Sequence, residues 1–332
     1  MGIRTGRQYR ESLRDGRPVY VNGERITDVT EYPPFRGMVD TLASIYDLQH
    51  GTEQGVLCYP SPRTGEPVST SFLAARTVEE VARRMRGEER RCEESFGLLG
   101  RLPDFCNALV TDVAAIAPVV AQSDARLAEN ILRYYEVVRD HDLCLTHTLI
   151  DPQVDRSRGP SEQPDASLTL HVVRETDAGV IVRGARMLST LAPFSNELWV
   201  GPFMPRKPGE ERYAICFALP VATPGLKFIC REPYDAGRSA FDRPLTSRFD
   251  EEDALAIFED VLVPWERVFI NGNLEIWNTL FSLVPGYFAL QAVVRGMVKL
   301  RFLAGIACHI AEAIGRANEP LPGGARRAHC LG

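Results

Sequence analysis

Hydrophobic and polar positions follow a helical period over much of the first 140 residues. Thr77-Val78-Glu79-Glu80 has the form of a capping box, in which the Thr77 hydroxyl accepts from an orphan N–H and Glu80 reaches back to the cap. The charged run that follows, through Arg91, is typical of a solvated helix face. The segment Gly97–Pro103 then predicts a turn.

A further helix start is predicted at Ser123-Asp124, since both residue types favour the cap position. Apolar side chains recur beyond it at helical spacing: Leu127, Ile131, Tyr134 or Tyr135, and Val138. Residues 77–140 are therefore predicted to form two or three helices.

The pattern changes near residue 150 to short apolar or alternating runs separated by Gly, Pro and Asp, which are typical of strands. The candidate strands are Leu168–Val173, Gly179–Val182, Leu198–Gly201, Tyr213–Leu219, Leu226–Cys230 and Ala254–Val261. Thr176-Asp177-Ala178-Gly179 is a hairpin signal between the first two. No helical run separates the strands, so an antiparallel barrel or sandwich is favoured over a doubly wound parallel sheet.

The helical period returns after Val263-Pro264-Trp265. Residues 276–294 carry no formal charge, but Pro285-Gly286 would break a spanning helix, so a buried helical hairpin is predicted in place of a membrane span. A broad apolar stripe then predicts a long helix that packs against other helices. The stripe consists of Leu290, Val293, Val294, Met297, Leu300, Leu303, Ala304, Ala307 and Ile310. No obvious partner for this helix follows it in the sequence.

Composition narrows the class of protein. With 38 Lys+Arg against 44 Asp+Glu in 332 residues, the formal net charge is −6, which excludes an electrostatically driven nucleic-acid binder. Hydrophobic residues at 45% and charged residues at 25% match globular proteins, so a sizeable core is expected. The length allows two domains, or three if the last is incomplete.

The eight cysteines are scattered, with no C-x-x-C and no zinc-finger spacing, which predicts reduced thiols and no metal site. The N-terminal residues Met1–Arg7 lack the apolar stretch of a secretory signal. Both observations favour a cytoplasmic protein.

Two dense polar segments rich in Gly or Pro are the candidates for chemistry, since the common nucleotide, metalloprotease and serine-hydrolase motifs are absent. They are Phe96–Phe105, which carries Arg101, and His141–Arg156, which carries His147. From the residues alone, Arg101 could simply cap carbonyl groups and His147 could be a half-buried structural histidine. Gln153 and Arg156 could equally tie helix to barrel, so the pattern names no reaction.

At these residues the sequence resembles the 4-hydroxyphenylacetate 3-monooxygenase family, the oxygenase components of two-component, reduced-flavin-dependent phenol hydroxylases. The resemblance is collinear from residue 4 to about residue 315. It is carried by Arg4-Thr5-Gly6 with Tyr9, Ser12–Arg17, Tyr46–His50, Phe96–Phe105, Leu145–Arg156, Gly184–Pro193, Pro224–Phe228, Ser247–Glu251 and Asp260–Val268.

The resemblance implies an α+β fold like that of acyl-CoA dehydrogenases. Residues 1–148 would form an N-terminal α-helical domain and residues 149–269 a central antiparallel β-barrel. Residues 270–332 would supply only the first helix, about 287–315, of a C-terminal four-helix bundle, with an unmatched tail from 318. A full-length form is expected to be a homotetramer, and this chain is expected to be a C-terminally truncated form relative to the family.

For function, the resemblance implies FAD, received as FADH₂ from an NAD(P)H-dependent flavin reductase, and reaction with O₂ through a flavin hydroperoxide. A para-substituted phenol would be hydroxylated ortho to its OH to give a catechol, in a site that excludes water. Arg101 and His147 would be catalytic and, with Phe105, would bind the substrate. The implied cofactor-binding residues are His147, Thr148, Leu149, Gln153, Val154, Asp155, Arg156 and Thr190.

Phe105 departs from the family, which commonly has Tyr at the end of this motif, so the substrate is expected to be 4-hydroxyphenylacetate or a bulkier, tyrosine-like phenol. Two alternatives remain. One is an FAD and iron–sulfur enzyme like 4-hydroxybutyryl-CoA dehydratase, although Cys92 and Cys106 suggest no ligand set. The other is an inactive truncated remnant, for which the tail 316–332 is the argument. If the chain is the native product, it is expected to bind FADH₂ poorly and to aggregate.

Overall fold

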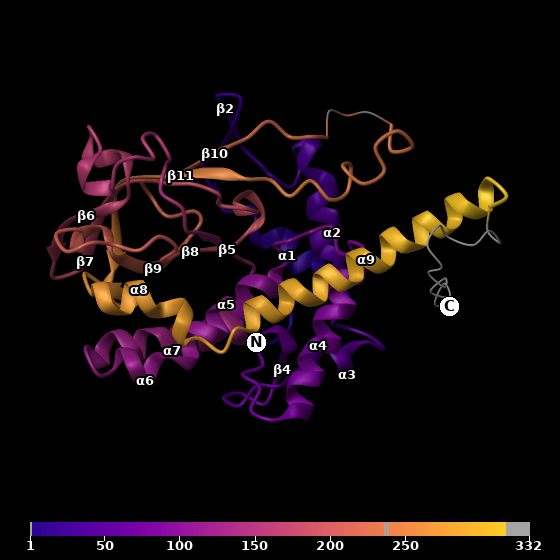
Figure 1. Cartoon of the computed structure of the whole chain (residues 1–332), viewed down its shortest axis with the longest axis horizontal. Coiled ribbons are helices and arrows are strands. Elements are labelled where there is room, and N and C mark those ends of the chain that lie inside the picture. Colours follow the sequence, from indigo (N-terminus) through magenta and orange to yellow (C-terminus); the bar gives the residue numbers. More distant parts are fainter. Residues whose placement is uncertain (1, 236, 238, 317–332) are drawn as a thin grey trace.

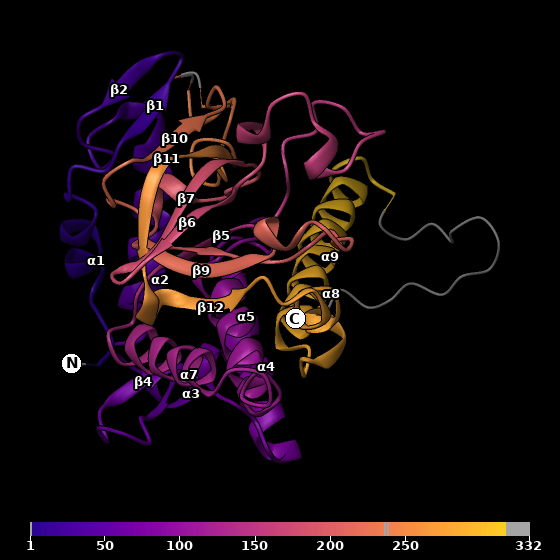
Figure 2. The same cartoon turned by 90° about the vertical axis from the view of Figure 1, so that its left-hand side faces the viewer.

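The computed structural model describes residues 2–235, 237 and 239–316, arranged as two β-sheets with helices packed around them (Figures 1 and 2). The helices are α1 Gly6–Ser12, α2 Arg36–Asp47, α3 Gln54–Leu57, α4 Val78–Glu93, α5 Pro103–Ala115, α6 Ala117–Val120, α7 Ala125–Asp140, α8 Leu274–Leu283 and α9 Tyr287–Ala313. The strands are β1 Val19–Val21, β2 Glu24–Ile26, β3 Cys58–Pro60, β4 Pro67–Ser69, β5 Leu145–Thr148, β6 His171–Thr176, β7 Gly179–Arg186, β8 Glu197–Val200, β9 Ile215–Pro220, β10 Leu226–Cys230, β11 Ala254–Pro264 and β12 Val268–Asn271.

The strands form a six-stranded sheet in the order β2-β1-β10-β11-β7-β6 and a four-stranded sheet in the order β12-β9-β8-β5, beside the small β3-β4 pair. Most pairs are antiparallel, but β1–β10 and β5–β8 are parallel. The predicted mixed fold is thus confirmed, while the barrel is not closed within the described residues. The strand predicted at 168–173 is shifted, because Ala166–Leu168 forms a 3₁₀ turn and β6 begins at His171.

The predicted hairpin at Thr176–Gly179 is confirmed. Thr176 pairs with Gly179 in the antiparallel β6–β7 ladder, so Asp177 and Ala178 form the two-residue turn. The Thr176 hydroxyl donates to the Gly179 carbonyl and accepts from the Gly179 N–H. These side-chain bonds satisfy backbone groups at the turn and fix the register of the sheet edge.

The charged helix α4 differs from its prediction in two respects. Thr77 caps it as expected, but Glu80 accepts from the backbone N–H of Arg76 instead of Thr77. Its charged run is solvated only in part, since Arg84, Glu88 and Arg91 are buried while Glu79 and Arg86 are exposed. The reason is a tertiary contact with helix α9. Arg84 pairs with Glu88 within α4, and its guanidinium stacks on the ring of Tyr287 at the start of α9.

The helices α5, α6 and α7 complete the region predicted at 77–140. Asp124 caps α7 by accepting from the backbone N–H groups of Arg126 and Leu127. The predicted apolar face is confirmed with Tyr134, not Tyr135, as its fully buried tyrosine. The residues between α4 and α5 form the turn that carries Arg101.

Two helices, α8 and α9, occupy the uncharged segment and are separated at Val284-Pro285-Gly286, as predicted. Within the described residues, no helix is long and apolar enough to cross a membrane. The carboxylate of Asp112 in α5 accepts from the first three backbone N–H groups of this corner, those of Gly286, Tyr287 and Phe288. Helix α9 therefore starts at a fixed point on α5.

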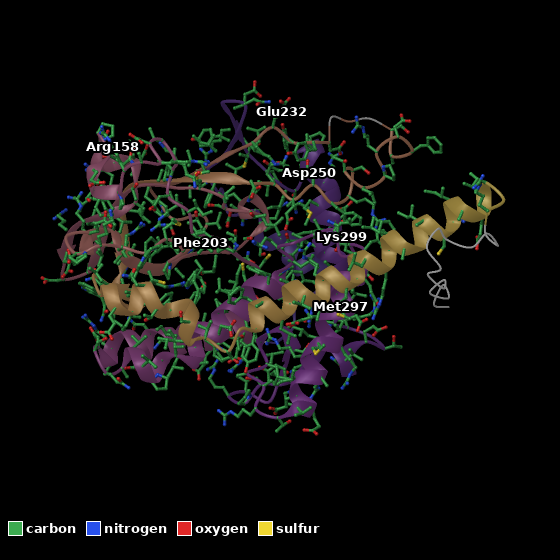
Figure 3. The ribbon with its side chains drawn as sticks, viewed as in Figure 1. Arg158, Phe203, Glu232, Asp250, Met297 and Lys299 are labelled. Carbon is green, nitrogen blue, oxygen red and sulfur yellow. The ribbon has the colours of Figure 1, made fainter. Side chains whose placement is uncertain are left out.

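Helix α9 crosses α4 and α5 and then extends past the rest of the molecule (Figure 1). It packs through Gln291, Val294 and Val298, which are buried. Most of the predicted apolar stripe lies elsewhere on the helix and is exposed, including Met297, which Figure 3 labels beside Lys299. The prediction that the whole stripe packs against helices is therefore wrong for the described residues, since α4 and α5 cover only one narrow face. The predicted tail from 318 lies outside the described residues.

The region predicted as helical also contributes strands to the large sheet. Strands β1 and β2, from the region predicted as helical, extend the six-stranded sheet through the β1–β10 pair. The domain boundaries at 148 and 269 stay predictions.

Six described cysteines are buried free thiols: Cys58, Cys92, Cys106, Cys144, Cys216 and Cys230.

Candidate functional site

Three of the residues predicted to act on a substrate lie together. The Arg101 Nε–H donates to His147 Nε2 at 2.9 Å, and the Arg101 guanidinium lies over the Phe105 ring, 4.1 Å from its centroid. The Phe105 and His147 rings are 5.7 Å apart between centroids. The first turn of α5 and the second-last residue of β5 thus meet at one point.

Local structure explains these positions. Pro103 opens α5 at its first helical position, which orients Phe105 from the first turn toward His147. Phe105 also packs edge-on against Phe288, 6.1 Å away at the start of α9. His147 is held in the four-stranded sheet by the parallel β5–β8 pair, opposite Trp199.

Burial and the adjacent Arg101 cation lower the pKa of His147 to about 3, so the imidazole is neutral at physiological pH. Arginine can only donate, so His147 Nε2 must accept and the ring proton must be on Nδ1. That Nδ1 is buried and has no hydrogen-bond partner among the described residues. An unsatisfied buried donor is costly, and this N–H is available to an acceptor atom of a ligand.

Backbone strain marks a second part of the predicted site, around Thr190. Leu188 and Leu191 both have a positive φ, 61° and 66°, which is uncommon for residues with a side chain. The Thr190 carbonyl accepts from the Thr146 hydroxyl, and the Thr190 hydroxyl donates to Asp253. Thr190 therefore lies against strand β5, close to His147 in the sheet.

The predicted cofactor-binding residues after His147 divide into two groups. Thr148 is fully buried and its hydroxyl donates to the Met187 carbonyl, while the Leu149 carbonyl accepts from Arg186. Gln153, Val154 and Arg156 are exposed. The second group is not brought into the Arg101–His147 cluster.

Asp155, between these exposed residues, is held by its own loop. Its carboxylate accepts from the Ser157 hydroxyl and N–H, which lower its pKa. Gln153 and Arg156 make no side-chain hydrogen bond or ion pair with any described residue.

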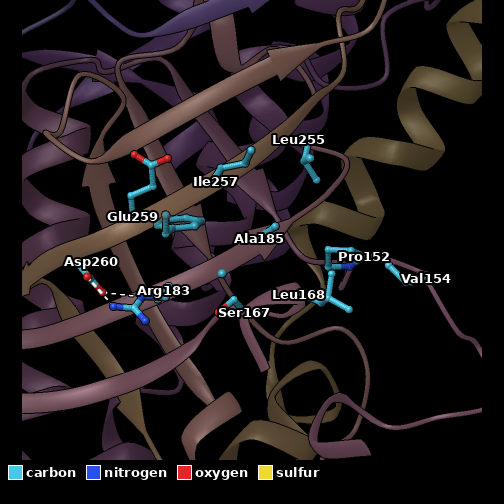
Figure 4. A pocket seen from close by; sticks show the side chains of 12 residues that line it. Pro152, Val154, Ser167, Leu168, Arg183, Ala185, Leu255, Ile257, Glu259 and Asp260 are labelled. Carbon is cyan, nitrogen blue, oxygen red and sulfur yellow. Dashed lines mark hydrogen bonds and ion pairs between the residues drawn. The ribbon is translucent and has the colours of Figure 1, made fainter. Parts of the chain in front are cut away.

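An apolar pocket of about 630 Å³ lies beside this exposed stretch, on the outer side of β7 and β11 (Figure 4). Pro152 and Val154 line one end of it, and Leu168, Ala185 and Leu255 line the middle. At the other end Arg183 and Asp260 form an ion pair, drawn dashed in Figure 4. The pocket borders the predicted cofactor-binding residues but does not include Arg101, Phe105 or His147.

Sequence reasoning gave no role to three groups that hold the site. Glu251 accepts from the backbone N–H groups of Gly100 and Arg101, and Asp253 accepts from Thr190. Asp151 pairs with both Arg186 and Arg206 and so ties the end of β5 to the loop before β9. A run of four acidic residues, Asp250–Asp253, was the available signal for the first two.

The described residues hold no group of three or more His, Cys, Asp or Glu side chains placed to bind a metal ion. Cys92 and Cys106, on either side of Arg101 in the sequence, are both buried. The alternative of an iron–sulfur enzyme therefore has no ligand set in this part of the chain.

Comparison with known proteins gives a consistent result. The family model described as "4-hydroxyphenylacetate 3-hydroxylase N terminal" matches residues 5–270. The chain is 42% identical over 320 residues to the oxygenase component of 4-hydroxyphenylacetate 3-monooxygenase from Geobacillus sp. (strain PA-9), covering 95% of this chain and 65% of the relative. It is 43% identical over 316 residues to the component of the same name from Thermus thermophilus, covering 94% and 64%.

Solved structures agree. A crystal structure of the oxygenase component of 4-hydroxyphenylacetate 3-monooxygenase, complexed with FAD and 4-hydroxyphenylacetate, matches with a TM-score of 0.88 at 42% identity, over 93% of this chain and 64% of that one. An archaeal 4-hydroxybutyryl-CoA dehydratase from N. maritimus, at 24% identity and a TM-score of 0.82, covers 96% of this chain and 64% of that one and shares the fold. The chain thus spans just under two thirds of the length of the relatives it matches.

Proposed function

The chain belongs to the 4-hydroxyphenylacetate 3-hydroxylase family, and from that membership we propose that it takes part in reduced-flavin-dependent hydroxylation of a para-substituted phenol. The proposed reaction is phenol + FADH₂ + O₂ → catechol + FAD + H₂O. The observation that carries the proposal is the buried, unpartnered Nδ1–H of His147 beside the Arg101 cation.

These residues suit a phenol because an electrophilic oxygen atom attacks the ring ortho to the OH most readily when the phenolic oxygen carries negative charge. The His147 Nδ1–H can donate a hydrogen bond to that oxygen, and the neighbouring Arg101 guanidinium stabilises negative charge on it. Phe105 offers an apolar ring for the aromatic ring of the substrate. Because His147 and Phe105 are buried, these interactions act with little competition from water.

The described residues also fit FAD. We propose that His147, Thr148, Leu149 and Thr190 hold the isoalloxazine, and that Gln153, Val154, Asp155 and Arg156 hold the phosphate-bearing part of the cofactor. When bound, reduced FAD reacts with O₂ and supplies the oxygen atom that enters the ring. The strained backbone around Thr190 and the apolar pocket at Pro152 and Val154 support this assignment.

The remaining parts of the proposal rest on family resemblance. A separate NAD(P)H-dependent flavin reductase supplies FADH₂, the protein acts in the cytoplasm, and a full-length form assembles as a homotetramer. The para substituent of the phenol is proposed to be that of 4-hydroxyphenylacetate or of a tyrosine-like compound, because Phe105 lacks the phenolic donor that family members commonly have here.

The test combines binding with turnover. A full-length form of the protein is titrated anaerobically with reduced FAD, then supplied with a flavin reductase, NADH, O₂ and a panel of para-substituted phenols that includes 4-hydroxyphenylacetate and tyrosine. We expect catechol from at least one phenol, and loss of it in Arg101→Ala but not in the control Arg133→Ala, which removes an exposed arginine paired with Glu129. Absence of both reduced-FAD binding and catechol would contradict the proposal. Iron in anaerobically purified protein would favour the dehydratase-like alternative.

A further inference from the structure

The loop that carries Arg101 is held by a carboxylate distant in the sequence. We propose that Glu251 is a positioning residue that sets the place of Arg101 by binding the main chain of its loop. The role in catalysis rests on the proposed function, whereas the geometric role does not.

Glu251 accepts two consecutive backbone N–H groups. Its Oε2 accepts from Gly100 at 3.1 Å, and its Oε1 accepts from Arg101. Neither N–H has another acceptor among the described residues. Since buried backbone donors are rarely left unpaired, this one side chain satisfies two groups that the loop cannot satisfy internally.

The carboxylate is itself fixed in place. Burial raises the pKa of Glu251, while the two N–H groups and Arg101 favour its charged form. Its own carbonyl accepts from Arg231 at 2.9 Å, and the preceding Asp250, labelled in Figure 3, accepts from Arg231 and from the N–H of Tyr234. A short segment anchored in this way loses little further freedom when it binds the loop.

The other end of the same loop is held by helix α9. Gly97, with a φ of +67°, lies so close to α9 that a Cβ there would be 2.5 Å from the backbone nitrogen of Lys299. Phe96 stacks on Phe302, with ring centroids 4.7 Å apart, and meets Phe249 edge-on. The start of the loop is therefore fixed by packing, and Glu251 is what fixes the half that carries Arg101.

The loop that carries Arg101 and the segment around Thr190 both bind the acidic run Asp250–Asp253. Asp253, two residues after Glu251, accepts from the Thr190 hydroxyl. Between them the backbone carbonyl of Glu252 accepts from the N–H of Leu191. One extended segment thus places both the Arg101 loop and the Thr190 segment relative to β5.

The chain offers a matched control one residue away. Glu252 is also buried, but its carboxylate oxygens have no hydrogen-bond partner among the described residues, and its Oε2 forms an ion pair with Arg231 at 3.5 Å. Glu251→Gln leaves one acceptor oxygen and turns an NH₂ group toward a backbone N–H, whereas Glu252→Gln changes no contact to the loop. The two variants differ in whether the replaced side chain binds the loop. Burial raises the pKa of Glu252 to about 8, so Glu252→Gln replaces a carboxyl group that is mostly protonated at pH 7.

Hydrogen exchange measures the geometric role directly. In Glu251→Gln, we expect the amides of Gly100 and Arg101 to exchange about tenfold faster or more, because they lose a charged acceptor, while peptides from β8 and β9 are unchanged. Glu252→Gln should leave the Gly100 and Arg101 amides as in the wild type. Unchanged exchange in Glu251→Gln, or an equal increase in both variants, would overturn the proposal.

Binding of 4-hydroxyphenylacetate gives the second readout, through a double-mutant cycle. Glu251→Gln should weaken binding about tenfold in the wild-type background and change it little in Arg101→Ala, since a positioning residue acts through the group it positions. Equal losses in both backgrounds would overturn the role. If the wild type binds no phenol, the proposed function fails, and the exchange result still decides whether Glu251 fixes the loop.

Discussion

The side chains of Arg101, Phe105 and His147 contact one another in a buried cluster, whereas those of Gln153, Val154 and Arg156 face solvent. The members of this cluster are positioned by contacts within the described residues: α5 carries Phe105, β5 carries His147, and Glu251 binds the loop of Arg101. In the exposed part, Gln153 and Arg156 make no side-chain hydrogen bond or ion pair with any residue that the structure describes, so both side chains are free to contact a ligand. The proposed substrate and cofactor contacts should therefore respond very differently to substitution.

The largest effect is expected for His147→Ala. Loss of the Nδ1–H donor should lower catechol formation by about 100-fold or more, while NADH is still consumed with release of H₂O₂. The measurement compares catechol, NADH and H₂O₂ in the reductase-coupled assay. His309→Ala, at an 87% exposed side chain, is the control and should behave as the wild type. If His147→Ala formed as much catechol per NADH consumed as the wild type, the proposed contact of His147 with the substrate would be contradicted.

The second-largest effect is expected from acid, which should lower the unfolding free energy of the protein through His147. The pKa of His147 is lowered to about 3 by burial and by Arg101, while in the unfolded chain it is about 6.5. The unfolded state therefore binds the extra proton between these values, and stability falls as the pH drops below 6.5. By pH 4 the wild type should lose about 3–4 kcal/mol of unfolding free energy relative to His147→Gln. Denaturant unfolding at pH 7, 5 and 4 measures it, and parallel curves for the two proteins would contradict the shift.

The third effect in size is expected from removing the Phe105 ring. Phe105→Ala removes a ring packed against Arg101, His147 and Phe288, so unfolding free energy should fall by about 3 kcal/mol. Phe241→Ala, at a 92% exposed ring, should change it by less than about 0.5 kcal/mol. Phe105→Tyr should fold normally and tests whether the hydroxyl changes the preferred phenol. A Phe105→Ala protein as stable as the wild type would show that the cluster is not tightly packed.

The smallest effect on stability is expected in the exposed part. Gln153→Ala and Arg156→Ala should each change unfolding free energy by less than about 0.5 kcal/mol, since neither side chain has a partner to lose. Either substitution should still weaken FAD binding if the cofactor supplies the missing contacts. Calorimetric titration with FAD, beside thermal unfolding of the same samples, separates the two effects. A large loss of stability would mean that this part is also held by the protein.

The sequence predicted local features well where a local pattern determines them. Asp124 as the cap of α7, the two-residue turn at Thr176–Gly179 and the break at Pro285-Gly286 all follow from neighbouring residues. The charged run of α4 was predicted to be solvated, which is wrong for Arg84 and Glu88, because their burial depends on α9, which follows about 200 residues later. Amphipathic spacing alone cannot reveal that a charged face will be covered.

The same reasoning explains what was found and missed in the site. Arg101, Phe105 and His147 were identified through motifs within two short segments, and the fold brings them together. Glu251 was not given a role, because its partners are backbone N–H groups, which every residue has, at a loop 150 residues away. The exposure of Gln153 and Arg156 was also not predictable, since motif resemblance carries no information about burial.

The parallel β1–β10 pair has a consequence for how the protein is made. Val19 pairs with Phe228, so the strand at the N-terminus finds its partner only after a further stretch of roughly 200 residues has left the ribosome. At about 5–20 residues per second, β1 and β2 wait on the order of 10–40 s as an unpaired two-stranded edge. During translation this edge is the part of the chain most open to pairing with another nascent copy or to binding by a chaperone.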